Sequence, residues 1–141
     1  MREIRLTVDT VPVAQPRQRV GVIAGHAHNY TPAKHPVNAY KAAVQVAARE
    51  AGLPHPLLEG PLIVTMIFYL PRPKRLMRKK DPAGPIPHAA RPDRDNLEKS
   101  TYDALNKLVW QDDSQIYDGN VAKFYHEKDG HPRVEILIRE K

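Results

Sequence analysis

Cysteine is absent from the sequence, and its absence excludes disulfide bridges, thiolate zinc sites and cysteine nucleophiles. No apolar run reaches the roughly 18 residues that a membrane-spanning helix requires, and residues 1–10 lack a secretory hydrophobic segment. We therefore expect a cytoplasmic protein without a membrane partner. A chain of 141 residues suits one domain, and a domain of this size buries roughly two thirds of its unfolded surface.

Acidic side chains are few except in one segment. The net charge is +6 and the isoelectric point about 9.7. Residues 1–92 carry 14 basic and 5 acidic side chains, whereas residues 93–118 carry 3 basic and 7 acidic ones. A positive surface attracts the phosphate backbone of nucleic acids, and an acidic segment within it can hold a metal ion. This distribution favours nucleic-acid binding, although many soluble proteins share such an isoelectric point.

The hydrophobic pattern predicts strands and helices in mixed order. Residues 62–70, Leu-Ile-Val-Thr-Met-Ile-Phe-Tyr-Leu, are rich in β-branched and aromatic side chains. They predict a central strand covered on both faces, by helices or by a second subunit. A helix is expected over residues 38–51, capped by Asn38 and ended by Gly52. Further strands are expected at residues 2–9, 121–126 and 133–139.

Turn-forming residues complete the fold prediction. Six proline and glycine residues between positions 11 and 36 predict a loop without long regular elements. The pair Asp129-Gly130 favours a hairpin between the last two strands. We predict one α/β (α+β) domain over residues 1–141, with a mixed or mainly antiparallel sheet of four or five strands and two main helices.

Residues 91–115 combine acidic pairs with a helical pattern. Asp93 and Asp95 precede it, Lys99 follows within its first turns, and Asp112 and Asp113 come after it. The apolar stripe of this helix comprises Leu97, Thr101, Ala104, Leu105 and Leu108. Because Asp95, Lys99 and Asp103 are spaced by four, they share the opposite side.

Carboxylates grouped in this way suit a hard divalent cation. Mg²⁺ prefers oxygen ligands from one or two carboxylates, together with waters and a substrate phosphate. A nearby ammonium group can orient an attacking water or offset the charge that develops in the transition state. Two plainer interpretations stay open at this point, because an aspartate before a helix is commonly a cap and an acidic pair after one is commonly a solvated turn.

Three motifs resemble the signature of RusA-type Holliday-junction resolvases. They are Asp-Arg-Asp-Asn-Leu-Glu-Lys at 93–99, Asp-Ala-Leu-Asn at 103–106 and Trp-Gln-Asp-Asp-Ser-Gln-Ile at 110–116, and the resemblance extends over most of the chain. It implies that Asp93, Asp95 and Asp113 are catalytic, metal-binding carboxylates, and that Lys99 is the catalytic lysine. Asp112 matches a neighbouring acid of the family. Arg94 departs from the pattern, because some members carry an apolar residue there.

The resemblance also implies cofactors and partners. The metal would be Mg²⁺, for which Mn²⁺ can substitute, and the DNA partner would be a four-way junction. The protein would act as a homodimer, whose two-fold symmetry matches a junction that must be cut twice. Hydrolysis would leave a 5′-phosphate.

Basic residues on both sides of the acidic segment are candidates for phosphate contacts. Residues 72–80 carry six basic side chains and no acid, and we expect residues 71–91 to form a basic loop that is mobile without DNA. The residues expected to bind DNA are Arg17, Arg19, Lys74, Arg75, Arg78, Lys79, Lys80, Arg91 and Arg94.

The sequence therefore predicts a bacterial or phage-encoded, Mg²⁺-dependent endodeoxyribonuclease that resolves four-way junctions in recombination and repair. Two alternatives remain at this stage. One is a metal-dependent nuclease that acts on flaps, replication forks or RNA. The other is a DNA-binding module without catalysis, in which the acidic residues only cap and brace the helix.

Overall fold

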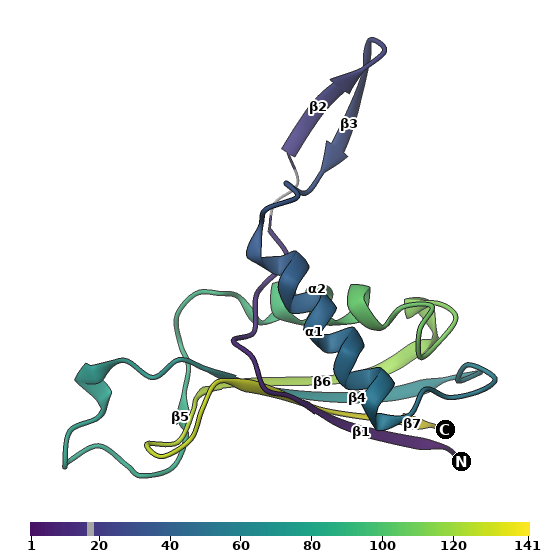
Figure 1. The fold of residues 1–141 in the computed structure, drawn as a ribbon. Coiled ribbons are helices and arrows are strands. Elements are labelled where there is room, and N and C mark those ends of the chain that lie inside the picture. Colours follow the sequence, from purple (N-terminus) through teal and green to yellow (C-terminus); the bar gives the residue numbers. More distant parts are fainter. Residues whose placement is uncertain (17–18) are drawn as a thin grey trace.

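The computed structural model describes residues 1–16 and 19–141. A five-stranded mixed sheet is covered on one face by two helices, and a two-stranded hairpin stands apart from them (Figure 1). In chain order the elements are β1 (Glu3–Val8), β2 (Arg19–Ile23), β3 (His26–Tyr30), α1 (Pro36–Ala51), β4 (Leu62–Leu70), η1 (Lys74–Leu76), β5 (Ile86–Pro87), α2 (Arg94–Leu105), η2 (Asp113–Gln115), β6 (Ile116–Tyr125) and β7 (Arg133–Glu140), where η marks a short 3-10 helix. The predicted α+β class and mixed sheet are confirmed.

The order of strands in the sheet is β1-β7-β4-β6-β5. The strand β4 is central, as predicted, and pairs antiparallel with β7 and parallel with β6. The expected hairpin between the last two strands is wrong, because β4 lies between them. The turn at Gly130, whose N–H donates to the Glu127 carbonyl, instead leads the chain across the end of β4.

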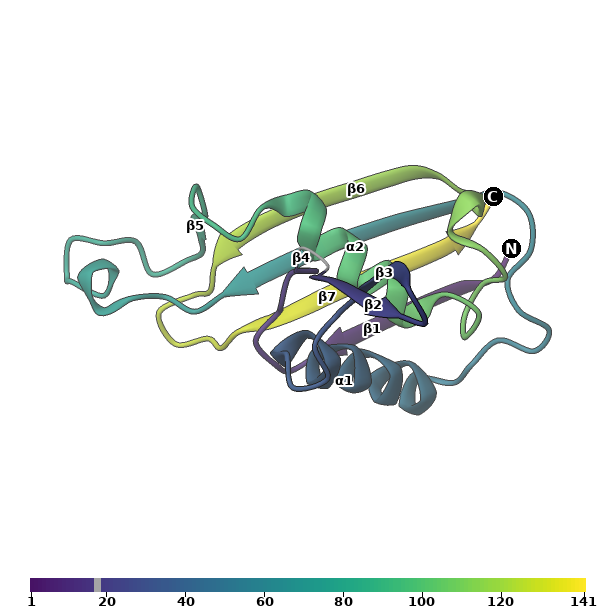
Figure 2. The same cartoon turned by 90° about the horizontal axis from the view of Figure 1, so that it is seen from above.

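The core lies between the sheet and the two helices. Alternate residues of β4 are fully buried beneath them, from Leu62 to Leu70. The helices are joined by a buried hydrogen bond between Tyr40 Oη and Thr101 Oγ1 at 2.8 Å, and Figure 2 shows both lying across the same face of the sheet. The other face of β4 is only half-buried, so the helices cover one face of this strand, and the covering of the second face by another subunit stays a prediction.

The helix α1 begins two residues before the predicted start. His35, not Asn38, is its N-cap, since the His35 Nδ1 accepts from the Val37 N–H at 3.0 Å and proline occupies the first helical position. The Asn38 amide instead donates to the carbonyls of Pro32 and Ala33. The predicted end is confirmed: Gly52 adopts φ 95° at the C-cap.

The expected loop at residues 11–36 contains a hairpin, which corrects the sequence prediction. The strands β2 and β3 pair in register around Ala24 and Gly25, whose φ values are 52° and 80°. Positive φ at both positions defines a type I′ turn. The prediction failed because alanine is not among the residues that signal this turn. Within residues 1–16 and 19–141, no helix is long and apolar enough to cross a bilayer.

Candidate active site

The first turn of α2 presents two exposed carboxylates. Asp93 occupies the N-cap position, with extended backbone angles, yet its side chain makes no capping hydrogen bond within the described chain. Asp95 Oδ1 accepts only the adjacent Asn96 N–H, at 3.0 Å. Capping therefore does not use the Asp93 carboxylate, and the positive end of the helix dipole favours negative charge there.

The segment that leads into α2 is held by a lysine from the sheet. Lys123 of β6 donates from Nζ to the carbonyl oxygens of Ala90 and Pro92, the latter at 2.7 Å. Arg91, Pro92, Asp93 and Asn96 line a hollow of about 490 Å³. Lys123 thus sets the backbone next to Asp93. The sequence could not reveal this contact, because 31 residues separate Lys123 from Pro92.

A second hollow lies between α2 and β6, with a volume of about 510 Å³. Its polar lining includes Arg94, Asp95, Glu98 and Asn120. Glu98 Oε2 accepts from Tyr102 Oη at 3.1 Å. The absence of a side chain at Gly119 lets β6 approach this pair, because a Cβ there would lie 2.9 Å from the Tyr102 hydroxyl oxygen.

Asp113 belongs to η2, which follows the C-terminal end of α2, and its carboxylate lies near Lys99 and Asp103 in the middle of that helix. Its Oδ1 accepts from the Trp110 Nε1–H at 2.7 Å, and Trp110 is fully buried. Burial raises the pKa of the Asp113 carboxyl, and the Asp103 and Asp112 carboxylates raise it further. The Trp110 N–H and the Lys99 ammonium oppose that rise in pKa. Trp110 therefore fixes the direction in which Asp113 points.

Lys99 stands on the exposed side of α2. Its Nζ lies 3.5 Å from Asp103 Oδ1, one turn along the helix, which confirms the predicted shared side of these two residues. Asp103 also pairs with Lys41 of α1, at 3.8 Å. Because Lys99 affects the pKa of Asp113, its ammonium lies within electrostatic reach of that carboxylate.

Asp112 is the N-cap of the short helix η2. Its Oδ2 accepts from the Ser114 N–H at 3.0 Å, and the Gln115 side chain returns the contact by accepting from the Asp112 N–H. This reciprocal arrangement is a capping box. The Ser114 hydrogen bonds lower the pKa of the Asp112 carboxyl. Of the two neighbouring acids, Asp112 caps η2 and Asp113 turns toward α2.

The predicted ligands are divided between two places. Asp93 and Asp95 lie on the first turn of α2, whereas Asp113 lies beside Lys99 and Asp103. Among residues 1–16 and 19–141, no three histidine, aspartate or glutamate side chains form a group that could hold a metal ion. The first-turn pair nevertheless fits Mg²⁺ chemically, because this ion accepts one or two carboxylates and completes its shell with water and phosphate. Glu98, Tyr102 and Trp110 are residues beside the predicted ligands that the sequence prediction did not include.

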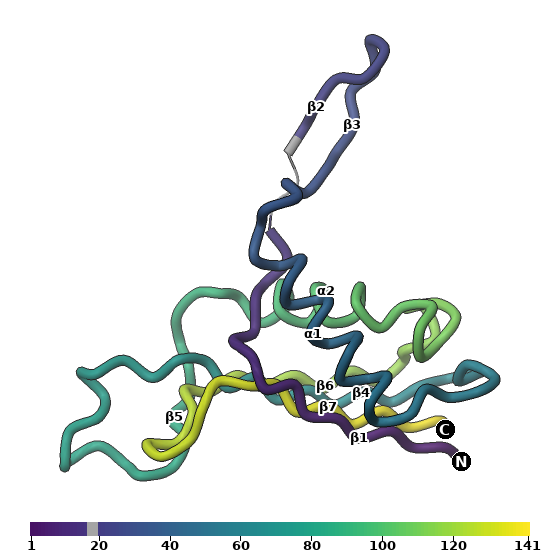
Figure 3. The backbone as a smooth tube through the Cα atoms, in the orientation of Figure 1, coloured from purple at the N-terminus to yellow at the C-terminus, as the bar shows by residue number. Residues whose placement is uncertain are grey.

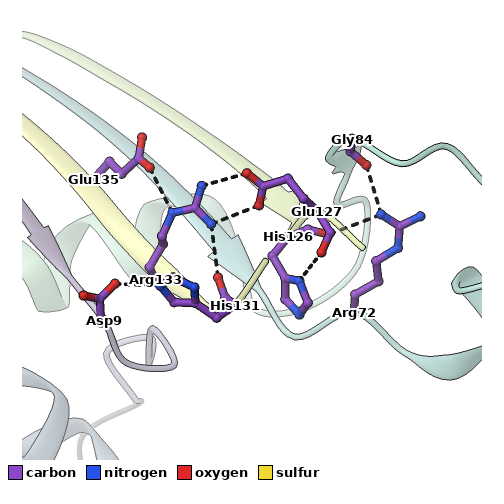
Figure 4. Close-up of polar contacts among 8 residues, drawn as sticks. All are labelled: Asp9, Arg72, Gly84, His126, Glu127, His131, Arg133 and Glu135. Atoms are coloured by element: carbon purple, nitrogen blue, oxygen red, sulfur yellow. Dashed lines mark hydrogen bonds and ion pairs between the residues drawn. The ribbon is translucent and has the colours of Figure 1, made fainter. Parts of the chain in front are cut away.

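The basic segment 71–91 is organised around a buried arginine. The Arg72 guanidinium donates to the carbonyls of Leu76, Pro82, Gly84 and His126, and Figure 4 shows its contacts with the last two of these residues. The Arg72 side chain is buried. Next to it, Arg133 binds both Glu127 and Glu135. These contacts hold the base of the segment against the end of the sheet. Its mobility without DNA stays a prediction.

The other basic residues of this segment face solvent. Lys74, Arg75, Arg78, Lys79 and Lys80 are all exposed, as are Arg91 and Arg94 beside the carboxylates. Of the predicted DNA contacts near the N-terminus, Arg17 and the side chain of Arg19 lie outside the described residues. The exposed cations therefore lie in the segment that leads into α2 and on the first turn of the helix itself.

Comparison with known proteins identifies the family. Residues 9–139 match the family Endodeoxyribonuclease RusA. The chain is 39% identical to "Uncharacterized protein YqaN" of Bacillus subtilis (strain 168), over 97% of this chain and 96% of that protein. It is 43% identical to "Crossover junction endodeoxyribonuclease rusA" of Enterobacteria phage 82, over 39% of this chain and 45% of that protein.

The chain therefore belongs to the RusA family of endodeoxyribonucleases. The match extends from the end of β1 into β7, so it includes both acidic pairs, Lys99 and the basic segment.

Proposed function

We propose that the protein is a Mg²⁺-dependent endodeoxyribonuclease that resolves four-way DNA junctions by paired phosphodiester hydrolysis. The observation that carries this proposal is the pair of exposed carboxylates at the positive end of α2, with the Asp93 side chain free of capping bonds. Exposed cations precede this pair in the chain and surround it on the helix. Such a surface suits a phosphate group drawn against a metal ion. Because the substrate is cellular or phage DNA, we place the activity in the cytoplasm, in recombination and repair.

Each residue of the site has a chemical role in this proposal. Asp93 and Asp95 hold the ion, which when bound polarises the scissile phosphate and lowers the pKa of a water molecule. Asp113 approaches along α2 and receives a proton from the attacking water or completes the acidic shell. Lys99 offsets negative charge at the phosphate. Arg91 and Arg94 bind the flanking phosphates, because guanidinium groups contact two phosphate oxygens at once.

The basic segment guides the DNA toward the carboxylates. Five exposed cations lie between residues 74 and 80, and each phosphate that they neutralise releases condensed counterions. Arg72 holds the backbone of the segment in shape through four carbonyl contacts. The segment therefore binds DNA irrespective of base sequence, and its affinity for DNA falls steeply as the salt concentration rises.

A homodimer would place two such sites on one junction. The face of the sheet opposite the helices is half-exposed, and it carries apolar side chains such as Ile67 and Leu137 among charged ones such as Arg5 and Glu135. A second copy related by a two-fold axis would cover this face with an identical, self-complementary surface. Light scattering of the native protein should give twice the monomer mass, whereas Ile67→Lys should give the monomer mass. Val46→Lys, on the exposed side of α1, is the matched control.

The activity is tested with a labelled four-way junction and the matching linear duplex, each with Mg²⁺. Asp95→Asn keeps the shape of the side chain and removes its charge, and Asp129→Asn makes the same change in an exposed turn far along the chain. The native protein and Asp129→Asn should make paired, symmetric nicks in the junction only, while Asp95→Asn binds the junction without cutting it. Preferred cutting of flaps or forks would instead indicate another branched substrate. Binding without cutting of any branched DNA by the native protein would indicate a binding module.

A further inference from the structure

The β2–β3 hairpin projects from the domain with an apolar face uncovered. Its strands pack chiefly on each other, and Figure 3 shows it standing clear of the sheet and the helices. Val20 and Val22 are 68% and 72% exposed and share one face with their partners Asn29 and Ala27. An isolated two-stranded hairpin is marginally stable in water, so an exposed β-branched face of this kind indicates a surface that is covered in the working complex.

The opposite face of the hairpin is partly packed by its own side chains. The His28 and Tyr30 rings stack with centroids 5.6 Å apart. They lie over Gly21, where a Cβ would approach His28 Cε1 to 2.8 Å. The ring pair therefore contributes internal packing on this face, where Ile23 near the turn is nevertheless 65% exposed, and the valines of the other face, at 68% and 72%, are the more exposed.

The stem of the hairpin is attached to the helix that carries the carboxylates. The Gln15 N–H donates to the Asn96 carbonyl at 2.9 Å, and Ser100 Oγ donates to the Val13 carbonyl at 2.7 Å. Asn96 lies between Asp95 and Leu97 on the first turns of α2. Five-residue strands extend about 17 Å, so a DNA strand bound at the first turn of α2 passes within reach of the hairpin.

The charge of this region selects the class of partner. No aspartate or glutamate occurs from residue 10 to residue 49, a span that contains five lysine or arginine residues. Because this segment has no carboxylate, it does not repel the negative charges of a phosphate backbone. For the same reason it offers no acidic side chain to pair with a basic protein surface. Charge complementarity therefore favours nucleic acid over a second copy of this basic chain as the cover for Val20 and Val22.

We propose that the β2–β3 hairpin recognises the branch point of the DNA by laying its Val20–Val22 face against base surfaces that are exposed there. This inference rests on the proposed junction nuclease activity. In a linear duplex each base is covered on both faces by its neighbours. At a branch point the stacking is interrupted, and an apolar side chain gains by covering the exposed base. The hairpin therefore contributes to the choice of branched over linear DNA, while the basic segment contributes to binding both.

The test uses the double substitution Val20→Thr/Val22→Thr, which keeps the β-branched shape and adds two hydroxyl groups. Val46→Thr makes the same change at a half-exposed position of α1. Affinities for a four-way junction and for its matching duplex are measured in the Asp95→Asn background, so that the DNA stays intact, with 2-aminopurine at the branch point. The ratio of junction to duplex affinity should fall about tenfold for the double variant, and the fluorescence change should diminish. Val46→Thr should alter neither.

Three results would overturn the proposal. An unchanged affinity ratio with an unchanged fluorescence signal would show that the valine face does not contact the branch point. A fall in dimer mass for the double variant, measured by light scattering, would show that the hairpin binds a second copy instead. Junction cleavage by the native protein is scored in parallel: if it occurs while the ratio is unchanged, only the hairpin proposal fails, and if the native protein neither cuts nor prefers junctions, both proposals fail.

Discussion

The two acidic pairs of the site have similar composition and different surroundings. At the start of α2, Asp93 and Asp95 are exposed, and together they accept a single backbone N–H. At η2, Asp112 accepts the Ser114 N–H within a capping box, and Asp113 accepts the Trp110 Nε1–H. The comparison shows that an aspartate at a helix start can be identified as a cap or as a free ligand only when its hydrogen-bond donors are known.

The largest effect expected from this comparison separates Asp93 from Asp112. Asp93→Asn should reduce the single-turnover rate of junction cleavage by about 10³-fold, because a charged metal ligand is lost, with no loss of thermal stability. Asp112→Ala should do the reverse, leaving cleavage within a few-fold and lowering the melting temperature, because the side chain that caps η2 by accepting from the Ser114 N–H is removed. Equal losses of cleavage in both variants would remove the distinction between the two pairs.

Asp113→Asn should also separate activity from stability. The amide oxygen can still accept from Trp110, and the half-buried charge is removed. Because the folded state raises the pKa of Asp113, it binds this proton more tightly than the unfolded chain does. The native carboxylate therefore destabilises the fold above that pKa, and this cost disappears as pH falls through it. Asp113→Asn should melt no lower than the native protein at neutral pH and cleave about 10²-fold more slowly.

The pH profile gives an independent check on Asp113. If its ionised form is needed, cleavage should decline on the acid side at a higher pH than an ordinary aspartate would produce. The cleavage rate and the melting temperature are to be measured across the same pH range. An acid limb at the ordinary aspartate position, or a clear loss of stability in Asp113→Asn, would contradict this assignment.

A further prediction concerns Lys123, which holds the backbone next to Asp93 of the first acidic pair. Lys123→Met removes both contacts to the Ala90 and Pro92 carbonyls while retaining the length of the side chain, so Asp93 should lose its fixed position. We expect kcat to fall about tenfold with a smaller change in KM. Lys123→Arg should recover part of the lost kcat, since it can donate to the same carbonyls. A change confined to DNA affinity would show that Lys123 contacts DNA instead of positioning Asp93.

A smaller effect is expected at the Glu127–Arg133 pair beside the basic segment. The Arg133 hydrogen bonds lower the pKa of Glu127 to about 2. This pair therefore stabilises the fold fully above the usual glutamate pKa, and the contribution is lost as pH falls from there toward 2. Glu127→Gln should cost about 1 kcal/mol at neutral pH and flatten the acid side of the stability curve, as measured by denaturant unfolding at several pH values.

The smallest effect concerns the hairpin turn. Ala24 has φ 52°, a value that asparagine tolerates better than alanine. Ala24→Asn should stabilise the hairpin by about 0.5 kcal/mol, seen as slower amide hydrogen exchange in β2 and β3 only. Slower exchange throughout the sheet would show that the hairpin unfolds together with the domain.

Much of the fold could be predicted because it depends on local patterns. The alternation of β1, the apolar run of β4 and the glycine end of α1 are all readable from neighbouring residues. The hairpin β2–β3 was missed because Ala24 does not signal its turn. The pairing of β6 and β7 was misjudged because a favourable Asp-Gly turn says nothing about a strand inserted from elsewhere in the chain.

The spacing of the chain indicated the two acidic pairs and Lys99 as candidates, and the family resemblance favoured Asp113 over Asp112. The capping role of Asp112 was not predictable, because it depends on the positions of the Ser114 N–H and the Gln115 side chain. The buried Arg72 looked like one more cation in a basic run, because only the folded chain brings four carbonyl groups around it. Contacts over long sequence separations, such as Lys123 with Pro92, leave no local signal.

The most direct test of the central claim is Mn²⁺ binding in the presence of junction DNA, measured by electron paramagnetic resonance. The native protein and Asp112→Asn should bind Mn²⁺ equally, whereas the Asp93→Asn/Asp95→Asn variant should lose this binding while retaining the DNA. Undiminished Mn²⁺ binding in Asp93→Asn/Asp95→Asn, or its loss in Asp112→Asn alone, would contradict the assignment of the metal to the first turn of α2.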